Sequence, residues 1–237
     1  SGKQQWRKPL RWAMDWLRDQ IVPVYETEMA KFAIDPWQAR NDYIKVINDR
    51  RTENVDAYLK QIAGRDLKDD EKVSALKLLE MQRNAMLMFT SCGWFFDDIA
   101  GIETLQIMQY ASRVIQLVKE ITGRDLEPAY ENILEKAECN LKEFANGRKV
   151  YDTLVKTSTI DLNRVGAHLA ASLIFEKCGE DRDLYCYSTK IESCERNEAG
   201  IQTLATGRAS IQSNIVLEKH SVDFAVLHFG DHNLVCA

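Results

Sequence analysis

The residues best suited to chemistry lie in the stretch 89–101, which reads FTSCGWFFDDIAG. It places Gly93 and Trp94 just before the adjacent carboxylates of Asp97 and Asp98, between two segments with helical periodicity. A glycine allows close approach of the backbone, an indole offers a broad apolar face, and carboxylates accept hydrogen bonds from hydroxyl groups. Together, these residue types are typical of a pocket for a polyhydroxylated ligand.

The same stretch also has a structural interpretation. Its aromatic side chains could fill the core at a connection between helices, while Asp98 forms the N-cap of the next helix. Because buried aromatics are ordinary, composition alone favours this interpretation. Asp97 and Asp98 would also point apart in either a helical or an extended backbone, so they are poor candidates for the two carboxyl groups that hydrolyse a glycosidic bond. We therefore predict no catalytic residue in this chain.

A second polar cluster, His228, Asp231 and His232 followed by Asn233, ends the last long apolar segment. Two histidines beside an aspartate suggest a metal site, but a tight turn in which Asp and Asn bond to their own backbone explains the pattern better. We keep this cluster as a secondary candidate site. We predict neither a metal nor another cofactor.

Composition restricts the partners. The chain has 237 residues, 45% of them hydrophobic, and its net charge is 31 − 36 = −5. This charge disfavours a nucleic acid or an anionic membrane as partner. No window approaches the roughly 18 apolar residues of a membrane span.

The six cysteines form no Cys-x-x-Cys pair. We therefore expect unpaired thiols and a reducing, cytoplasmic compartment.

Apolar residues at helical spacing predict an array of six to eight helices in the first three quarters of the chain. The predicted segments are 9–32, kinked or divided at Pro23, then 36–47, 54–62, 69–89, 102–121, 128–144 and 160–176. Asp35 should cap the second segment, and Gly64 and Gly123 should end two others. Residues 85–89 are apolar all round, so we expect this helix end to be buried on every side.

After residue 179 the period changes from 3.6 to 2. Segments 185–192, 200–217 and 222–229 predict a small antiparallel sheet of three to four strands, and the last of them, apolar on both faces, should be covered on both sides. The expected class is α+β. No linker-like composition separates the helical part, 1–178, from the sheet part, 179–237, so we expect residues 1–237 to form a single compact unit.

The run LLEMQRNAMLMFTSCGWFFDDIAGIET, residues 78–104, closely resembles the domain of unknown function 3536. Further matches lie at residues 7–10, 16–18, 35–37, 185–187 and 225–233, so the resemblance covers nearly the whole chain. That domain follows the catalytic barrel in a branch of family-57 glycoside hydrolases. We accordingly expect this chain, which starts without a methionine, to be a piece of a longer protein with the barrel upstream.

The resemblance implies an accessory domain that completes the sugar-binding cleft of the barrel. In the family, the catalytic glutamate and aspartate belong to the barrel, and the helical region after it contributes a motif that looks like Ser-Asp-Trp followed by aromatics and acids. The chain differs from that motif at Cys92 and Gly93. The substrate-binding residues implied here are Ser91, Gly93, Trp94, Phe95, Asp97 and Asp98.

Two alternatives to this function remain. The chain could be a structural or interaction module that docks the barrel or dimerises without touching a carbohydrate. It could also be a self-standing enzyme that uses Asp97, Asp98 and Glu103, which we place last. The resemblance points to a parent protein that is a glycoside hydrolase or a glucanotransferase, and we do not expect the isolated domain to be active.

Overall fold

A computed structural model describes residues 3–176, 181–231 and 233–236. The chain divides into two compact units, residues 1–159 and 160–237. Helices α1 to α9 precede a sheet that has five antiparallel strands within the described residues. The α+β class with helices first is therefore confirmed, whereas the predicted three to four strands are too few.

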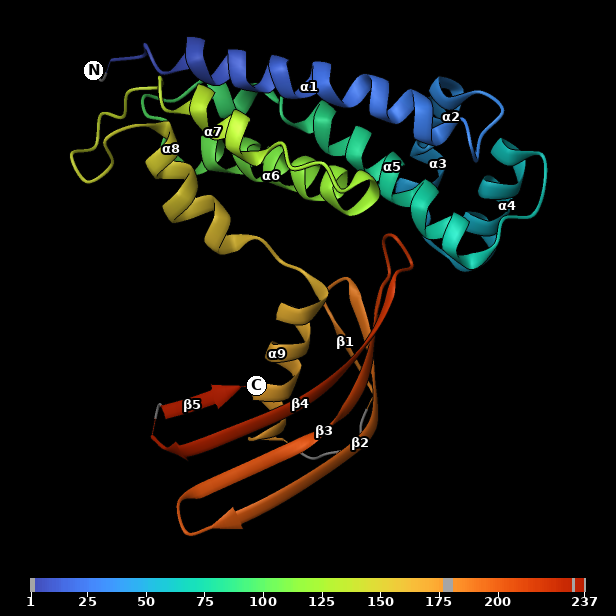
Figure 1. Cartoon of the computed structure of the whole chain (residues 1–237), viewed down its shortest axis with the longest axis vertical. Helices are drawn as coiled ribbons and strands as arrows, with labels where there is room; N and C mark the ends of the chain where they lie inside the picture. Colours follow the sequence, from blue (N-terminus) through green and yellow to red (C-terminus); the bar gives the residue numbers. More distant parts are fainter. Residues whose placement is uncertain (1–2, 177–180, 232, 237) are drawn as a thin grey trace. The chain divides into compact units, whose positions relative to one another are not determined.

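The first unit is helical. Its helices are α1 (Arg7–Met29), α2 (Pro36–Asp42), α3 (Ile44–Asn48), α4 (Thr52–Ala63), α5 (Asp69–Leu87), α6 (Ile102–Thr122), α7 (Glu127–Leu134) and α8 (Gly147–Val150). Three short helical turns complete it, η1 (Ser91–Trp94), η2 (Tyr151–Val155) and η3 (Lys156–Ser158). Helix α1 packs against α5, α6 and α7, and α5 packs along α6 (Figure 1). Their inward residues, such as Leu17, Leu79 and Ile107, are fully buried and form the core.

Local signals place several helix ends correctly. The Asp35 side chain accepts hydrogen bonds from the amides of Trp37 and Gln38, both at 3.0 Å, so it caps α2 as predicted. Gly64 and Gly123 end α4 and α6 with φ of 68° and 73°. Glycine favours this left-handed conformation because it has no Cβ to clash with the backbone.

Other helix boundaries differ from the prediction. Helix α1 is not divided at Pro23, while the alternative of a kink there stays a prediction. The predicted helix 128–144 instead ends at Leu134. The amide of Gly147 donates to the carbonyl of Ala137 at 2.7 Å, which closes residues 137–147 into a loop. The chain then re-enters a helical conformation at α8.

The predicted all-round burial of residues 85–89 is wrong. Ala85 and Met88 are buried, but Met86 is 52% exposed. An apolar sequence indicates which side chains favour burial, but it does not show whether another segment covers each face of the helix. The stretch 91–98 that follows is consequently not sealed inside the helices, since Phe95 is 75% exposed.

The second unit wraps a sheet around one helix. It consists of α9 (Leu162–Leu173), β1 (Arg182–Leu184), β2 (Tyr187–Ala199), β3 (Gln202–Ser213), β4 (Lys219–Gly230) and β5 (Asn233–Cys236). The strands lie in sequence order, each antiparallel to the next, and α9 packs on β3, β4 and β5 (Figure 1). Helix α9 packs on the sheet, and the two compact units accordingly divide between residues 159 and 160. That the whole chain forms a single unit stays a prediction.

Strand alternation determines which side chains meet α9. Leu169 and Leu173 of α9 share a buried cluster with Ala205, Ala209 and Phe224 of the sheet. The predicted coverage of β4 on both faces is wrong, because Phe229 is 42% exposed and Leu227 only half-buried. We call the face opposite α9 the outer face of the sheet.

Candidate functional site

The predicted site, residues 91–98, forms a loop between α5 and α6. Turn η1 occupies its first half, and Phe95 and Phe96 follow with exposed fractions of 75% and 46%. Their rings meet edge to face with centroids 5.4 Å apart. The loop therefore presents a pair of aromatic side chains to solvent.

Gly93 holds this loop against α6. A Cβ added at Gly93 would lie 2.5 Å from the side chain of Ile107, closer than real Cβ contacts allow. The hydroxyl of Thr104, also in α6, donates to the Gly93 carbonyl at 2.9 Å. Gly93 is buried, so its observed role is packing.

Asp98 is engaged by the protein itself. Its Oδ1 accepts from the amide of Ala100 at 2.8 Å, and its Oδ2 accepts from the amide of Asn140 at 2.7 Å. The Cys139 thiol also donates to Oδ1, and burial raises the pKa of this thiol to about 11, which keeps it protonated. The predicted N-cap role of Asp98 is wrong, because Gly101 occupies the N-cap position of α6. Asp98 instead ties the loop to residue 140.

Asp97 lies next to Asp98 but is exposed. Its Oδ1 accepts from the side-chain amide of Gln4 at 3.1 Å. Its carbonyl accepts from the Trp6 indole at 3.1 Å and from the Asn140 side chain at 2.9 Å. The backbone of Asp97 is thus fixed, while its carboxylate stays at the surface.

The segment 3–7 is bound to the loop along its length. The guanidinium of Arg7 donates to the carbonyls of Phe95, at 2.7 Å, and Phe96, at 3.2 Å. Lys3 exchanges two hydrogen bonds with Asn140, at 3.0 and 3.1 Å. Sequence reasoning missed Arg7 and Asn140, because neither lies near residue 95 in the sequence.

Trp94 is half-buried beside α1. The guanidinium of Arg11 lies 5.9 Å from the Trp94 ring and 4.7 Å from the Phe89 ring, within the range of cation–π attraction. The indole nitrogen of Trp94 is buried and has no hydrogen-bond partner among the described residues. Ser91 is exposed at the start of η1. The surface face of the predicted site thus consists of Ser91, part of Trp94, Phe95 and Asp97.

The described part of the secondary candidate site forms a turn. His228 Nε2 lies 3.2 Å from the carbonyl of Asp231, and the His228 ring meets that of Phe175 at 5.3 Å. Asp231 has a φ of 52°, as in a tight turn between β4 and β5. His232 lies outside the described residues. Within the described ranges, no three His, Cys, Asp or Glu side chains are grouped to hold a metal ion.

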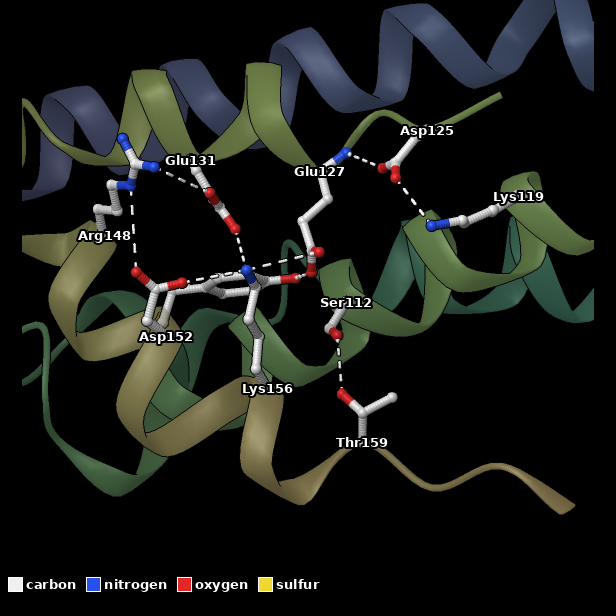
Figure 2. Close-up of polar contacts among 10 residues, drawn as sticks. Ser112, Lys119, Asp125, Glu127, Glu131, Arg148, Asp152, Lys156 and Thr159 are labelled. Carbon is white, nitrogen blue, oxygen red and sulfur yellow. Dashed lines mark hydrogen bonds and ion pairs between the residues drawn. The ribbon is translucent and has the colours of Figure 1, made fainter. Parts of the chain in front are cut away.

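A charged cluster that the sequence did not reveal joins α7 to the helical stretch 147–158. Lys156 Nζ lies among the carboxylates of Glu127 at 3.5 Å, Asp152 at 3.1 Å and Glu131 (Figure 2). Arg148 approaches Glu131 from the other side at 3.4 Å. Glu131 is buried, so it depends on both cations.

The charges of this cluster stabilise each other. Burial disfavours the charged form of Lys156, but its bonds to Glu131 and Asp152 outweigh burial and raise the pKa of Lys156 above its ordinary value. The hydroxyl of Tyr151, in the π-helical turn η2, donates to Glu127 at 3.1 Å. With every acid engaged by a cation or a hydroxyl, we interpret the cluster as an ion-pair network that holds residues 147–158 on α7.

The cysteines differ in part from the prediction. Cys92, Cys139, Cys186 and Cys236 are free thiols, as expected. Cys194 is disulfide-bonded, so the expectation of unpaired thiols is wrong at this position. Cys178 lies outside the described residues. The cytoplasmic compartment stays a prediction. In the part of the chain that is described, no helix has both the length and the hydrophobicity to cross a membrane.

The comparisons with known proteins settle the family. The model of a family described as a domain of unknown function (DUF3536) matches residues 3–237. The chain belongs to this family. The match extends over both units, so the helical unit and the sheet unit are two parts of the domain of unknown function 3536. No curated protein and no solved structure matches the chain.

Proposed function

We propose that this domain of unknown function 3536 is the accessory carboxy-terminal domain of a family-57-like glycoside hydrolase. In this role it completes the sugar-binding cleft of a catalytic barrel that lies upstream in the same polypeptide. The observation that carries the proposal is that the ring of Phe95 and the carboxylate of Asp97, two residues apart in the loop, are both exposed.

A sugar is amphipathic, so it can contact both an aromatic ring and a carboxylate. The C–H face of a pyranose packs on an aromatic ring, while its hydroxyls donate hydrogen bonds at the ring's edge. Gln4 is bonded to Asp97 Oδ1, which leaves Oδ2 as the acceptor for a hydroxyl. Both oxygens of Asp98 are already bonded. We therefore assign the sugar contact to Asp97 and a supporting role to Asp98.

The anchoring of the loop supports a place beside an upstream domain. Arg7 and Trp6 bind the backbone of residues 95–97, so the loop is held on the segment through which the chain would arrive from a barrel. A rigid backbone at this point presents Phe95 without the entropic cost of ordering a free loop. The barrel would supply the nucleophile and the acid, so the domain alone should not hydrolyse a glucan.

The test is steady-state kinetics of the full-length parent enzyme on a soluble α-glucan. Phe95→Ala and Asp97→Asn should each raise KM about tenfold, since a stacking or charged contact contributes about 1–2 kcal/mol. The matched control is Ile34→Ala, which removes an exposed apolar side chain that belongs neither to the loop nor to its flanking residues and should leave KM unchanged. Unchanged KM values in both loop variants, with unfolding midpoints equal to wild type, would contradict the proposal.

A docking module is the second candidate function. Apolar side chains are exposed at both ends of the loop, Met86 at 52% and Ile102 at 77%, as expected of a protein contact. If this candidate holds, Met86→Ala and Ile102→Ala should lower the melting temperature of the full-length enzyme and leave that of the isolated domain unchanged. Sugar binding would then be unaffected by Phe95→Ala.

A further inference from the structure

The outer face of the sheet carries polar side chains in register across four strands. Asp183 of β1 pairs with Ser188 of β2, Ser188 with Gln212 of β3, and Gln212 with Lys219 of β4. Side chains paired across neighbouring strands point to the same face, about 5 Å apart. The neighbour Ile211 points the other way, toward Gly166 of α9, so this row lies opposite the helix.

A second row runs beside the first. Lys190 of β2 pairs with Ser210 of β3, and Ser210 pairs with Ser221 of β4. Along β3, Ser210 and Gln212 are two residues apart, which is about 7 Å. Lys190 and Lys219 thus stand diagonally on either side of the Ser210 hydroxyl and the Gln212 amide.

These two rows border a hollow with a volume of about 390 Å³. Its lining includes Lys190, Ser210, Gln212 and Lys219, with Asp181, Arg182 and Asp183 on the side of β1. The guanidinium of Arg182 is paired with Glu176. This volume falls within the range of about 300–1,000 Å³ that small-molecule sites occupy. The lining residues are polar or charged, which favours a polar ligand over an apolar one.

The lysines at this hollow differ from the cation on the next row of the same face. Arg208 forms a bidentate ion pair with Asp223 at 2.7 and 3.0 Å, so its charge is compensated. Lys190 and Lys219 are exposed and have no ion-pair or hydrogen-bond partner among the described residues. At the opposite end, Asp183 accepts from the Ser188 hydroxyl at 2.7 Å. The ammonium groups of Lys190 and Lys219 therefore lie on the two sides of β3, and the carboxylates of Asp181 and Asp183 lie on the side of β1.

We propose that this hollow on the outer face binds an anionic sugar. Lys190 and Lys219 bind its phosphate or carboxylate, Ser210 and Gln212 donate hydrogen bonds to it, and Asp183 accepts from the sugar hydroxyls. The assignment does not rest on the function proposed for the loop, because none of these residues belongs to the helical unit.

The test is an NMR titration of the whole chain with glucose 6-phosphate, with glucuronate, glucose and inorganic phosphate as parallel ligands. Saturable shifts of the amides of Ser188 and Ser210, with a Kd of about 1 mM, are expected for at least one of the two anionic sugars. Which of them binds more tightly identifies the anion. Glucose and inorganic phosphate should each bind at least about tenfold more weakly, because glucose lacks the anionic group and phosphate lacks the sugar hydroxyls.

The double variant Lys190→Gln/Lys219→Gln should weaken this binding at least about tenfold, and added salt should weaken it as well. Lys142→Gln, the same type of substitution at an exposed lysine of the helical unit, should bind as wild type. The proposal is overturned if neither anionic sugar shifts these amides, if the double variant binds as well as wild type, or if inorganic phosphate binds as tightly as glucose 6-phosphate. Equal binding of inorganic phosphate would show that the hollow is a site for simple anions.

Discussion

The loop 91–98 and the outer face of the sheet use polar side chains in opposite ways. In the loop, no ladder satisfies the backbone, so Arg7, Asn140 and Asp98 bond to its carbonyls and neighbouring amides. On the sheet, the strands satisfy each other's backbone groups, so side chains such as Lys190 and Ser210 are not needed for that purpose. An irregular segment must use side chains to hold itself, whereas a sheet leaves them available to a ligand.

The same contrast appears between two adjacent residues. Asp98 and Asp97 are chemically identical, yet Asp98 holds the loop with its side chain and Asp97 does so mainly with its carbonyl. A residue that is held by its carbonyl can thus leave its side chain at the surface, as at Asp97. Phe95 follows the same rule, because Arg7 binds its carbonyl and leaves its ring in solvent.

The largest effect should come from Gly93. Gly93→Ala places a methyl group against Ile107 and should lower the free energy of unfolding by about 3 kcal/mol, as for an overpacked core. Chemical denaturation of the domain measures this change. In a double-mutant cycle with Ile107→Ala the two losses should be less than additive, because the smaller side chain makes room. Full additivity would mean that Gly93 does not position the loop on α6.

The next largest effect concerns the two adjacent aspartates of the loop, Asp98 and Asp97. Asp98→Ala leaves the amides of Ala100 and Asn140 without an acceptor and should cost about 2 kcal/mol of stability. Asp97→Ala removes an exposed carboxylate and should change stability by less than about 0.5 kcal/mol. Chemical denaturation of both variants measures these changes in the free energy of unfolding. Equal losses of stability in the two variants would contradict the distinction between Asp98, whose carboxylate holds the loop, and Asp97, whose carboxylate is exposed.

The cluster around Lys156 extends the comparison to a second irregular segment. Lys156→Met removes the cation closest to buried Glu131 and should cost about 1–2 kcal/mol, less than for a fully buried pair because Lys156 is partly exposed. Arg148 stays as a partner of Glu131. Hydrogen exchange should then show faster opening of residues 147–158. Unchanged exchange there would mean that the network does not hold this stretch on α7.

The smallest effect concerns pH. Glu71 accepts from Arg65, at 2.7 and 2.8 Å, and from the amide of Lys68, at 2.9 Å, and these bonds lower its pKa from 4.5 to about 2. Since the folded-state pKa lies below the unfolded one, the stabilisation is complete above pH 4.5 and is lost as the pH falls toward 2. The stability difference between wild type and Glu71→Gln should therefore shrink across this window. A constant difference would show that the carboxylate is not held this way.

Short-range features were predictable because a few neighbouring residues decide them. Asp35 caps α2 through amides two and three positions away. Gly64 and Gly123 end their helices through their own backbone conformation. In the sheet, the period of 2 predicts strands because side chains alternate along any strand, and Ala205, Ala209 and Ile211 lie on the buried face.

The sequence by itself determined the α+β class, the order of helices before strands, and the helix boundaries at Asp35, Gly64 and Gly123. Only the tertiary structure decided that Met86 and Phe95 are exposed and that Asp98 is engaged by residue 140, 42 positions away. It alone also gathered Glu127, Glu131 and Lys156 into one network. The reason is physical: periodicity and capping depend on the backbone within one turn, whereas burial and hydrogen-bond partners depend on which distant segments pack nearby.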